Sequence, residues 1–315
     1  MRLPSLPANA TSRAMTVTGE TTVVVLSDIL VGDVWLAAGQ SNMAWPLQHT
    51  AEDNAVLRRR PVERTLRLYR EPPRCSDAPQ PANGRWTGSA WVNAKKFSAI
   101  GYHFGRALAE EGVPVGIVLA ARGGSPIEAW LPPDALPPAS AAERRGLLAE
   151  RDGRRAAFPV AMDEWLAVHE GDLADAPPPP SWPDTAPHLP GCYWDGMISG
   201  LHDTSVAGVL WYQGETDATR GTTGYADRLS LLLIELRKAY GRDLPIIVFG
   251  LPPLRTEPHT TAIRRAQEAV AAADPNTFLV PAEEPDADVL ELHPRPKRGP
   301  AERAVDITIL FADRD

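Results

Sequence analysis

The sequence is poor in cysteine. Only Cys75 and Cys192 occur among 315 residues, and they lie far apart in the chain. Protein sites for zinc and iron–sulfur clusters use closely spaced cysteines and histidines, a spacing that these two residues do not match. A single disulfide between them and a pair of reduced thiols are both compatible with the sequence.

An excess of positive charge is absent as well. Lys and Arg total 32 against 40 Asp and Glu, which gives a formal net charge of −8. Proteins that bind nucleic acids normally present a basic surface. We therefore expect no nucleic-acid partner.

Long apolar stretches are missing too. No run of about 18 apolar residues occurs, which excludes a membrane-spanning helix at the level of the sequence. The segment 1–20, MRLPSLPANATSRAMTVTGE, contains no continuous apolar core of the kind found in secretory signal peptides. We therefore expect no membrane partner and a cytoplasmic location.

What the chain does contain is an alternation of strand and helix patterns. Apolar residues make up 43% and charged residues 23%, an ordinary globular composition. Most of the strand patterns are continuously apolar, which is typical of parallel strands covered on both faces. The predicted strands are 21–29, 33–38, 115–121, 206–213, 245–250 and 277–280, and the predicted helices are 97–112, 224–241, 261–275 and 301–313. This order predicts an α/β fold with a mostly parallel sheet and with functional sites at the carboxyl ends of its strands.

Residues 134–190 interrupt the alternation. They contain LPPASAAERR, PPPPSWP and APHLP, and only short helical pieces are expected among them. Long segments with little secondary structure are uncommon in compact domains, and those that occur are usually functional or mobile. We interpret it as an insertion or lid over the sheet, within a single domain spanning 1–315.

The stretch AAGQSNMAW, residues 37–45, places Gln40, Ser41 and Asn42 directly after the strand predicted at 33–38. A serine in such a turn can project into the crevice while backbone amides point at an incoming oxygen, as an acyl-transfer nucleophile requires. The alternative is that Ser41 and Asn42 cap a helix amino terminus, the usual role of such residues.

Two further strand ends carry conspicuous residues. In ARGGSPIEAW, Gly123 and Gly124 would allow backbone to approach a ligand closely. In WYQGETD, polar side chains follow a buried strand and need partners that a ligand could supply; they are Gln213, Glu215 and Asp217. His293 comes late in the chain, in LELHPRPK, and could meet these strand ends in one crevice.

Together these blocks resemble the sialate O-acetylesterase family of the SGNH (GDSL-like) hydrolase superfamily. The resemblance rests on DVWLAAGQSNMAW, GGSPIEAW, GMISGL, GVLWYQGETDA and HPRPK, in this order and spacing over roughly 25–305. It implies a flavodoxin-like three-layer α/β/α fold. It also implies hydrolysis of O-acetyl or other short acyl esters, on a carbohydrate or glycosylated small molecule, without metal or other cofactor.

The same resemblance implies a role for individual residues. Ser41 is the nucleophile, with Gln40 and Asn42 lining its turn, and His293 is the general base. Gly123 or Gly124 supplies a backbone oxyanion donor. The remaining positions implied in oxyanion or substrate binding are Gln213, Glu215, Asp217 and Trp130. Gln213 is preferred over Asp217 as a side-chain oxyanion donor, because an ionised carboxylate cannot donate a hydrogen bond.

The acid that would orient His293 has two candidates. Glu291 lies two residues before the histidine, so in an extended segment both side chains point the same way. Asp288 lies five residues before and would need the chain to fold back. We favour Glu291, and the choice stays open at this point.

Two departures from the family pattern leave other functions open. The chain starts almost at the first block, so that segment 1–30 resembles a remnant of a preceding β-rich region, and Glu291 stands where the family often has aspartate. An acyltransferase using the same acyl-Ser41 and a non-catalytic carbohydrate-binding relative are the alternatives. The sequence does not indicate an oligomeric state.

Overall fold

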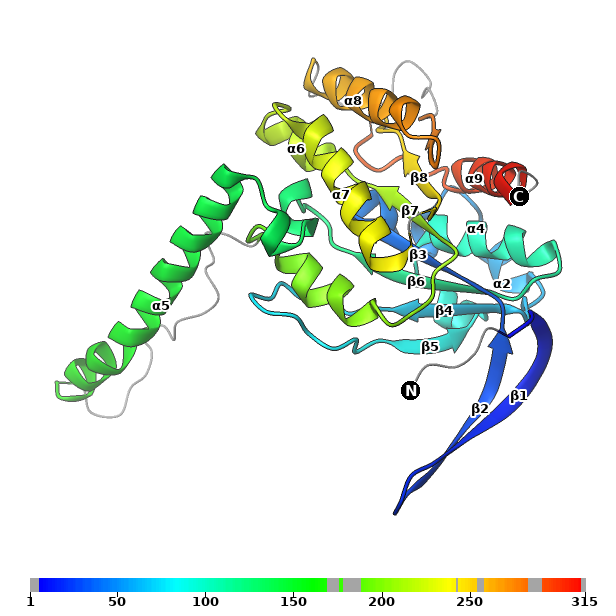
Figure 1. Cartoon of the computed structure of the whole chain (residues 1–315), viewed down its shortest axis with the longest axis horizontal. Helices are drawn as coiled ribbons and strands as arrows, with labels where there is room; N and C mark the ends of the chain where they lie inside the picture. The colour runs from blue at the N-terminus through cyan, green and yellow to red at the C-terminus, as the bar shows by residue number, and fades with distance from the viewer. Residues whose placement is uncertain are drawn as a thin grey trace.

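A seven-stranded sheet forms the centre of the protein, as the computed structural model in Figure 1 shows. The structure describes residues 6–168, 176–177, 188–241, 243–253, 258–282 and 291–312. The strand order is β5-β4-β6-β3-β7-β8-β9, and every neighbouring pair is parallel except β4 and β5. The strands are β3 (Asp33–Gly39), β4 (Leu66–Arg70), β5 (Arg85–Gly88), β6 (Val115–Ala121), β7 (Gly208–Tyr212), β8 (Ile246–Phe249) and β9 (Thr277–Val280).

Helices cover both faces of this sheet. Helices α4 and α9 pack against each other on one face, and α7 and α8 pack against each other on the opposite face (Figure 1). The α-helices are α1 (Ser41–Ala44), α2 (Asn54–Arg59), α3 (Trp91–Ala94), α4 (Ala99–Glu110), α5 (Pro138–Leu166), α6 (Glu215–Arg220), α7 (Tyr225–Tyr240), α8 (His259–Ala273) and α9 (Arg298–Ala312). Single turns of 3₁₀-helix span Leu47–His49, Ile127–Trp130, Pro133–Ala135 and Ser199–Leu201, and a π-helical turn spans Trp194–Ile198.

The predicted three-layer α/β/α fold is therefore confirmed. Every residue of β6, β7 and β8 is buried, which is why these strands show continuous apolar runs with no polar alternation. β3 lies between β6 and β7 in the middle of the sheet. Its carboxyl end therefore lies beside the carboxyl ends of β6 and β7. Where the connections from neighbouring strands run to opposite faces of the sheet, a crevice forms at these ends.

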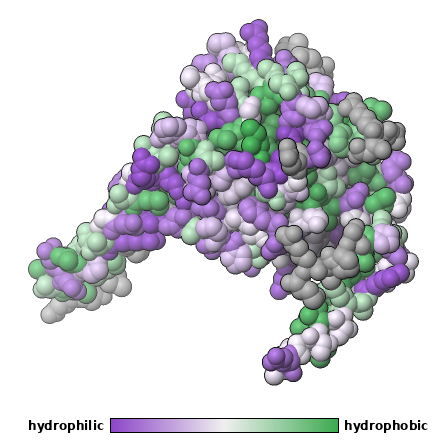
Figure 2. Space-filling model, in the orientation of Figure 1, coloured by the Kyte–Doolittle hydropathy of each residue, from purple (hydrophilic) through white to green (hydrophobic). Residues whose placement is uncertain are grey.

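The strand predicted at 21–29 does not join this sheet. It forms β2 (Val23–Val31), which pairs antiparallel with β1 (Asn9–Thr18) in a separate two-stranded ribbon. Figure 1 shows the ribbon projecting from the body, and Figure 2 shows apolar side chains exposed along it. Its exposed apolar residues include Val23, Val24, Val25 and Leu26.

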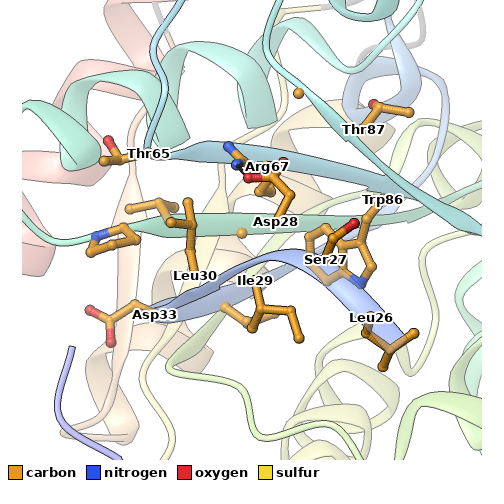
Figure 3. A pocket seen from close by; sticks show the side chains of 16 residues that line it. Leu26, Ser27, Asp28, Ile29, Leu30, Asp33, Thr65, Arg67, Trp86 and Thr87 are labelled. Carbon is orange, nitrogen blue, oxygen red and sulfur yellow. Dashed lines mark hydrogen bonds and ion pairs between the residues drawn. The ribbon is translucent and has the colours of Figure 1, made fainter. Parts of the chain in front are cut away.

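A cavity of about 450 Å³ lies between the base of this ribbon and the amino ends of the sheet strands (Figure 3). Trp86, the Asp28–Arg67 ion pair and the start of β6 line it. Trp86 is 47% exposed. Because β3 enters at Asp33 and leaves at Gly39, the cavity lies at the opposite end of the sheet from Ser41.

The 134–190 segment differs from the expectation of short helical pieces. α5 runs for 29 residues with Pro159 inside it, and Figure 1 shows it extending away from the sheet. The part that follows, 169–187, lies almost entirely outside the described residues, and a lid function stays a prediction. Cys192, just beyond it, forms a disulfide with Cys75, which resolves the alternative left open by the sequence.

Gly39 ends β3 in a conformation that requires glycine. Its φ is +132°, and a Cβ there would lie 2.2 Å from the backbone oxygen of Tyr212 on β7. That oxygen also accepts a hydrogen bond from the amide of Gln40 at 2.9 Å. The motif therefore contains Gly39 so that the chain can turn sharply, in close contact with β7, just before Ser41.

We expect Gly39→Ala to lower the free energy of unfolding by about 2–4 kcal/mol, because backbone strain and a steric clash add. Chemical denaturation would measure the loss. Gly146→Ala is the matched control, since a Cβ at this helical position meets open space. Equal stability of the two variants would contradict the close contact.

Candidate active site

Ser41 and His293 meet at the carboxyl end of β3. Ser41 Oγ lies 2.8 Å from His293 Nε2, although 252 positions separate them in the sequence. Ser41 is the first residue of α1, whose N-cap is Gln40 with no side-chain cap bond. The alternative interpretation of Ser41 and Asn42 as helix caps is therefore wrong, and the hydroxyl of Ser41 is directed at the imidazole.

The ring of His293 is held by an aromatic neighbour. Trp45 stacks on it with ring centroids 4.5 Å apart and an interplanar angle of 20°. Burial lowers the pKa of His293, and the positive charge of Lys297 lowers it further. The imidazole is therefore neutral at neutral pH and can accept a proton through Nε2.

Gly123, shortly after β6, lies close to Ser41. A Cβ added at Gly123 would lie 3.4 Å from the Cβ of Ser41, so the backbone of Gly123 passes close to Ser41. Gly124 has a φ of +73°, which turns the chain sharply at this point. This close approach suits the predicted use of backbone amides at Gly123 or Gly124 as oxyanion donors.

Asn42, the residue after Ser41, connects three parts of the site. Its Nδ2 donates to Glu215 Oε1 and, at 2.9 Å, to the carbonyl oxygen of Leu292. Its Oδ1 accepts from Lys297 Nζ at 2.5 Å. Asn42, Glu215 and Lys297 are all buried, and burial raises the pKa of the Glu215 carboxyl. Asn42 thus links the serine turn, the start of α6 and the histidine segment.

Gln213 does not serve as the predicted oxyanion donor in this geometry. It is fully buried, and its Nε2 donates to Asp217 Oδ2 at 2.5 Å and to Ser125 O at 3.1 Å. Asp217 also accepts from the amide of Ile127, and burial raises its pKa to about 7. Gln213 and Asp217 therefore tie the end of β7 to the loop after β6.

Gln40 and Trp130 also point into the protein. Gln40 Oε1 accepts hydrogen bonds from the amides of Gly214 and Thr216, at 3.3 and 3.4 Å. Trp130 is 1% exposed and donates to Ser125 Oγ at 2.9 Å, so its side chain is not available for the substrate contact that the resemblance implied. Both residues position backbone around the site.

Glu291, the favoured orienting acid, forms no hydrogen bond with His293. Glu291 is exposed, and no carboxylate among the described residues forms a hydrogen bond to His293. Asp288, the second candidate, lies outside the described residues. The extended geometry that favoured Glu291 therefore does not bring its carboxylate to the imidazole.

We accordingly expect Glu291→Gln to keep kcat within about two-fold of the wild-type value. Loss of a true orienting acid costs up to about 10⁴-fold in kcat. Asp288→Asn is the matched comparison, and kcat of both variants on one ester substrate is the measurement. A collapse of kcat in Glu291→Gln alone would restore the sequence-based choice.

The part of the chain that the structure describes contains no group of three or more His, Cys, Asp or Glu side chains arranged to hold a metal ion. Of the helices described, none has both the length and the apolar character needed to cross a membrane.

Sequence reasoning missed Lys297 and Ser125 as parts of the site. Lys297 was quoted within HPRPK and Ser125 within GGSPIEAW, yet neither was assigned a role. A lysine that follows a Pro-rich segment gives no sequence signal of burial, and only the fold places its ammonium against Asn42.

The three-layer α/β/α fold is that of the SGNH hydrolases, and the Ser41–His293 contact lies at the carboxyl end of its central strand β3. The chain belongs to the family described as carbohydrate esterase, sialic acid-specific acetylesterase, whose profile matches 31–143 and 194–297, more than half of the chain.

Similar proteins agree with this family. The sialate O-acetylesterase of Rattus norvegicus is 27% identical over 240 residues, covering 70% of this chain and 42% of the relative. That of Homo sapiens is 25% identical over 247 residues, covering 73% and 41%. The chain thus spans about two fifths of the length of these relatives.

Among solved structures, a carbohydrate acetylesterase from Xanthomonas citri matches with a TM-score of 0.75 and 26% identity. The match covers 97% of this chain and 62% of that one. A protein from Arabidopsis thaliana shares the fold, with a TM-score of 0.52 and 15% identity over 90% of this chain and 98% of that one.

Proposed function

We propose that the protein is a serine esterase that hydrolyses O-acetyl esters of a carbohydrate or glycosylated small molecule. The observation that carries the proposal is the 2.8 Å contact between Ser41 Oγ and His293 Nε2 at the carboxyl end of the sheet. Family membership and the carbohydrate acetylesterase relatives support the substrate class.

In this proposal Ser41 Oγ attacks the acyl carbon while His293 Nε2 takes its proton. The carbonyl oxygen becomes an oxyanion, for which the backbone amides of Ser41 and the Gly123-Gly124 turn are the donors. Collapse expels the sugar oxygen, which receives the proton from the imidazolium. Water, deprotonated by His293, then attacks the acyl-serine, and acetate and free Ser41 result.

The pH dependence follows from the state of His293. Only the neutral imidazole accepts the serine proton, so activity falls as pH falls through the pKa of His293. Because burial and Lys297 lower that pKa, we expect the acid limb of kcat/KM to be centred below the ordinary value of 6.5. A pH profile with p-nitrophenyl acetate measures it, and a midpoint above the ordinary value would contradict the expectation.

Acetate release from O-acetylated sugars and from p-nitrophenyl acetate tests the proposed function. A serine-directed phosphonate should label Ser41 and stop both reactions. Failure to turn over either ester, together with no labelling, would instead favour a non-catalytic carbohydrate-binding protein. Ester formation with an added polyol acceptor would favour an acyltransferase that uses the same acyl-Ser41.

A further inference from the structure

The indole of Trp45 covers one face of the His293 ring. The two rings are stacked, with centroids 4.5 Å apart and planes inclined by 20°. Ser41 Oγ approaches the same imidazole at its Nε2, 2.8 Å away. The ring that takes the serine proton in the proposed mechanism is therefore in contact with an aromatic face, and that mechanism gives the contact no role.

Trp45 is itself held in place. Its Nε1 donates a hydrogen bond to the carbonyl oxygen of His49 at 3.1 Å. Its own carbonyl oxygen accepts from the amide of Ala99 at 2.8 Å, which ties it to the buried first turn of α4. The tryptophan is therefore restrained at both its ring and its backbone.

The segment that carries the histidine is bonded to the same stretch of chain. The carbonyl oxygen of Arg295 accepts from the amide of Ala51 at 3.2 Å, and the Arg295 guanidinium donates to the carbonyl oxygen of Thr50 at 3.3 Å. Arg295 lies two residues after His293. Thr50 and Ala51 lie within six residues of Trp45. The two stacked rings thus belong to segments that hydrogen-bond to each other, which maintains the spacing between the rings.

The charge of the imidazole changes during the proposed reaction. His293 is neutral at first and becomes an imidazolium when it takes the proton of Ser41. The face of an indole carries partial negative charge and attracts a cation stacked on it. The contact with Trp45 therefore strengthens as the proton moves, so that it stabilises the transition state more than the ground state. Lys297 acts in the opposite direction, since its positive charge lowers the pKa of His293.

We propose that Trp45 is a positioning residue for the esterase reaction, whose indole fixes the plane of the His293 ring and stabilises the imidazolium. The inference rests on the proposed function, in which His293 is the general base. An aromatic ring then performs the two tasks that the carboxylate performs in a Ser-His-Asp triad. Within the described ranges, no carboxylate forms a hydrogen bond to His293 that would perform them instead.

Trp45→Phe and Trp45→Leu separate the aromatic face from the rest of the side chain. Both remove the Nε1 donor, whereas only phenylalanine keeps a ring face against the imidazole. We expect kcat on p-nitrophenyl acetate to fall by about 10–100-fold in Trp45→Leu but by no more than about three-fold in Trp45→Phe, with KM unchanged in both.

Trp86→Leu is the matched control. Trp86 also packs its ring against an aromatic neighbour, Tyr69, with centroids 5.2 Å apart, but it lines the cavity at the opposite end of the sheet (Figure 3). This variant should keep the wild-type kcat. A loss of kcat in Trp86→Leu as large as that in Trp45→Leu would show that removal of any such ring impairs the enzyme, and would overturn the inference.

A measurement without turnover separates this inference from the catalytic proposal. NMR titration of the His293 ring in the Ser41→Ala background reports the stability of the imidazolium whether or not an ester is hydrolysed. We expect a higher pKa of His293 with Trp45→Phe than with Trp45→Leu, because only the ring face favours the charged form. The charged and titratable groups on the surrounding segments are the same in both proteins; they are His49, Glu215, Glu291, Arg295 and Lys297.

Two results would overturn the role of Trp45. One is an equal kcat in Trp45→Phe and Trp45→Leu, and the other is an equal pKa of His293 in the two titrations. If the wild-type protein hydrolyses no ester, the proposed function fails, and the titration still decides whether the indole stabilises the imidazolium.

Discussion

Replacement of Ser41 by alanine is expected to lower kcat by about 10⁴–10⁶-fold. The substitution removes the atom proposed to attack the acyl carbon, while His293 and the proposed backbone donors remain. Acetate release from an O-acetylated sugar, followed over hours, is the measurement. The fold should be retained, because the side-chain hydrogen bond of Ser41 among the described residues is the one to His293.

Ser12→Ala is the matched control, since it removes the same hydroxyl from the projecting ribbon, where Ser12 Oγ donates to Asp28. It should keep wild-type kcat. Thermal unfolding of both variants confirms that any loss of activity is chemical. Retention of a tenth of the wild-type activity by Ser41→Ala would show that another group is the nucleophile.

The strands of the central sheet were predictable because burial on both faces leaves a continuous apolar run. β6 and β9 were predicted with their observed bounds, and β3, β7 and β8 to within a few residues. β4 and β5 were missed because they lack such a run. They lie at one edge of the sheet, where LRLYR and RWTG carry exposed arginines and no continuous apolar pattern.

Helix α5 was missed for a different reason. Its mean hydropathy is low and Pro159 interrupts its pattern, so the sequence there suggests only short helices. The structure continues the helix through this proline and buries only three of its residues, Ser140, Arg144 and Arg151. A helix that projects from the body has little apolar face by which the sequence could reveal it.

Convergence of the strand ends was predictable, whereas the direction of each side chain was not. Ser41, Gly123 and His293 meet as expected, because consecutive parallel strands bring their carboxyl ends to one edge of the sheet. Gln213 and Trp130 were assigned outward roles, yet both are buried. A shift of one residue along a turn changes the direction in which a side chain points. The sequence pattern does not indicate that direction.

The largest expected effect away from the nucleophile is at Asn42. Its amide group forms hydrogen bonds with Glu215, the Leu292 carbonyl and Lys297, and the side chains of Asn42, Glu215 and Lys297 are buried. The Leu292 carbonyl belongs to the peptide that leads into His293. Asn42 therefore fixes the position of the imidazole relative to Ser41, which is the adjacent residue in its own helix.

We expect Asn42→Ala to lower kcat by about 10²–10³-fold, because even a shift of about 1 Å between nucleophile and base is costly. The free energy of unfolding should fall by about 3–5 kcal/mol, since Glu215 loses a donor and Lys297 loses an acceptor inside the protein. Asn93→Ala is the matched control: Asn93 donates a comparable bond to a backbone carbonyl, that of Gly88, but at the surface.

Lys297→Met distinguishes positioning from general destabilisation. It keeps Asn42 bonded to the Leu292 carbonyl, while removing the charge that lowers the pKa of His293. Its acid limb should therefore move to higher pH with a smaller loss of kcat at the optimum than in Asn42→Ala. A different outcome would contradict the positioning role. If Asn42→Ala keeps the wild-type kcat and the wild-type acid limb of the pH profile, the hydrogen bond to the Leu292 carbonyl does not position His293.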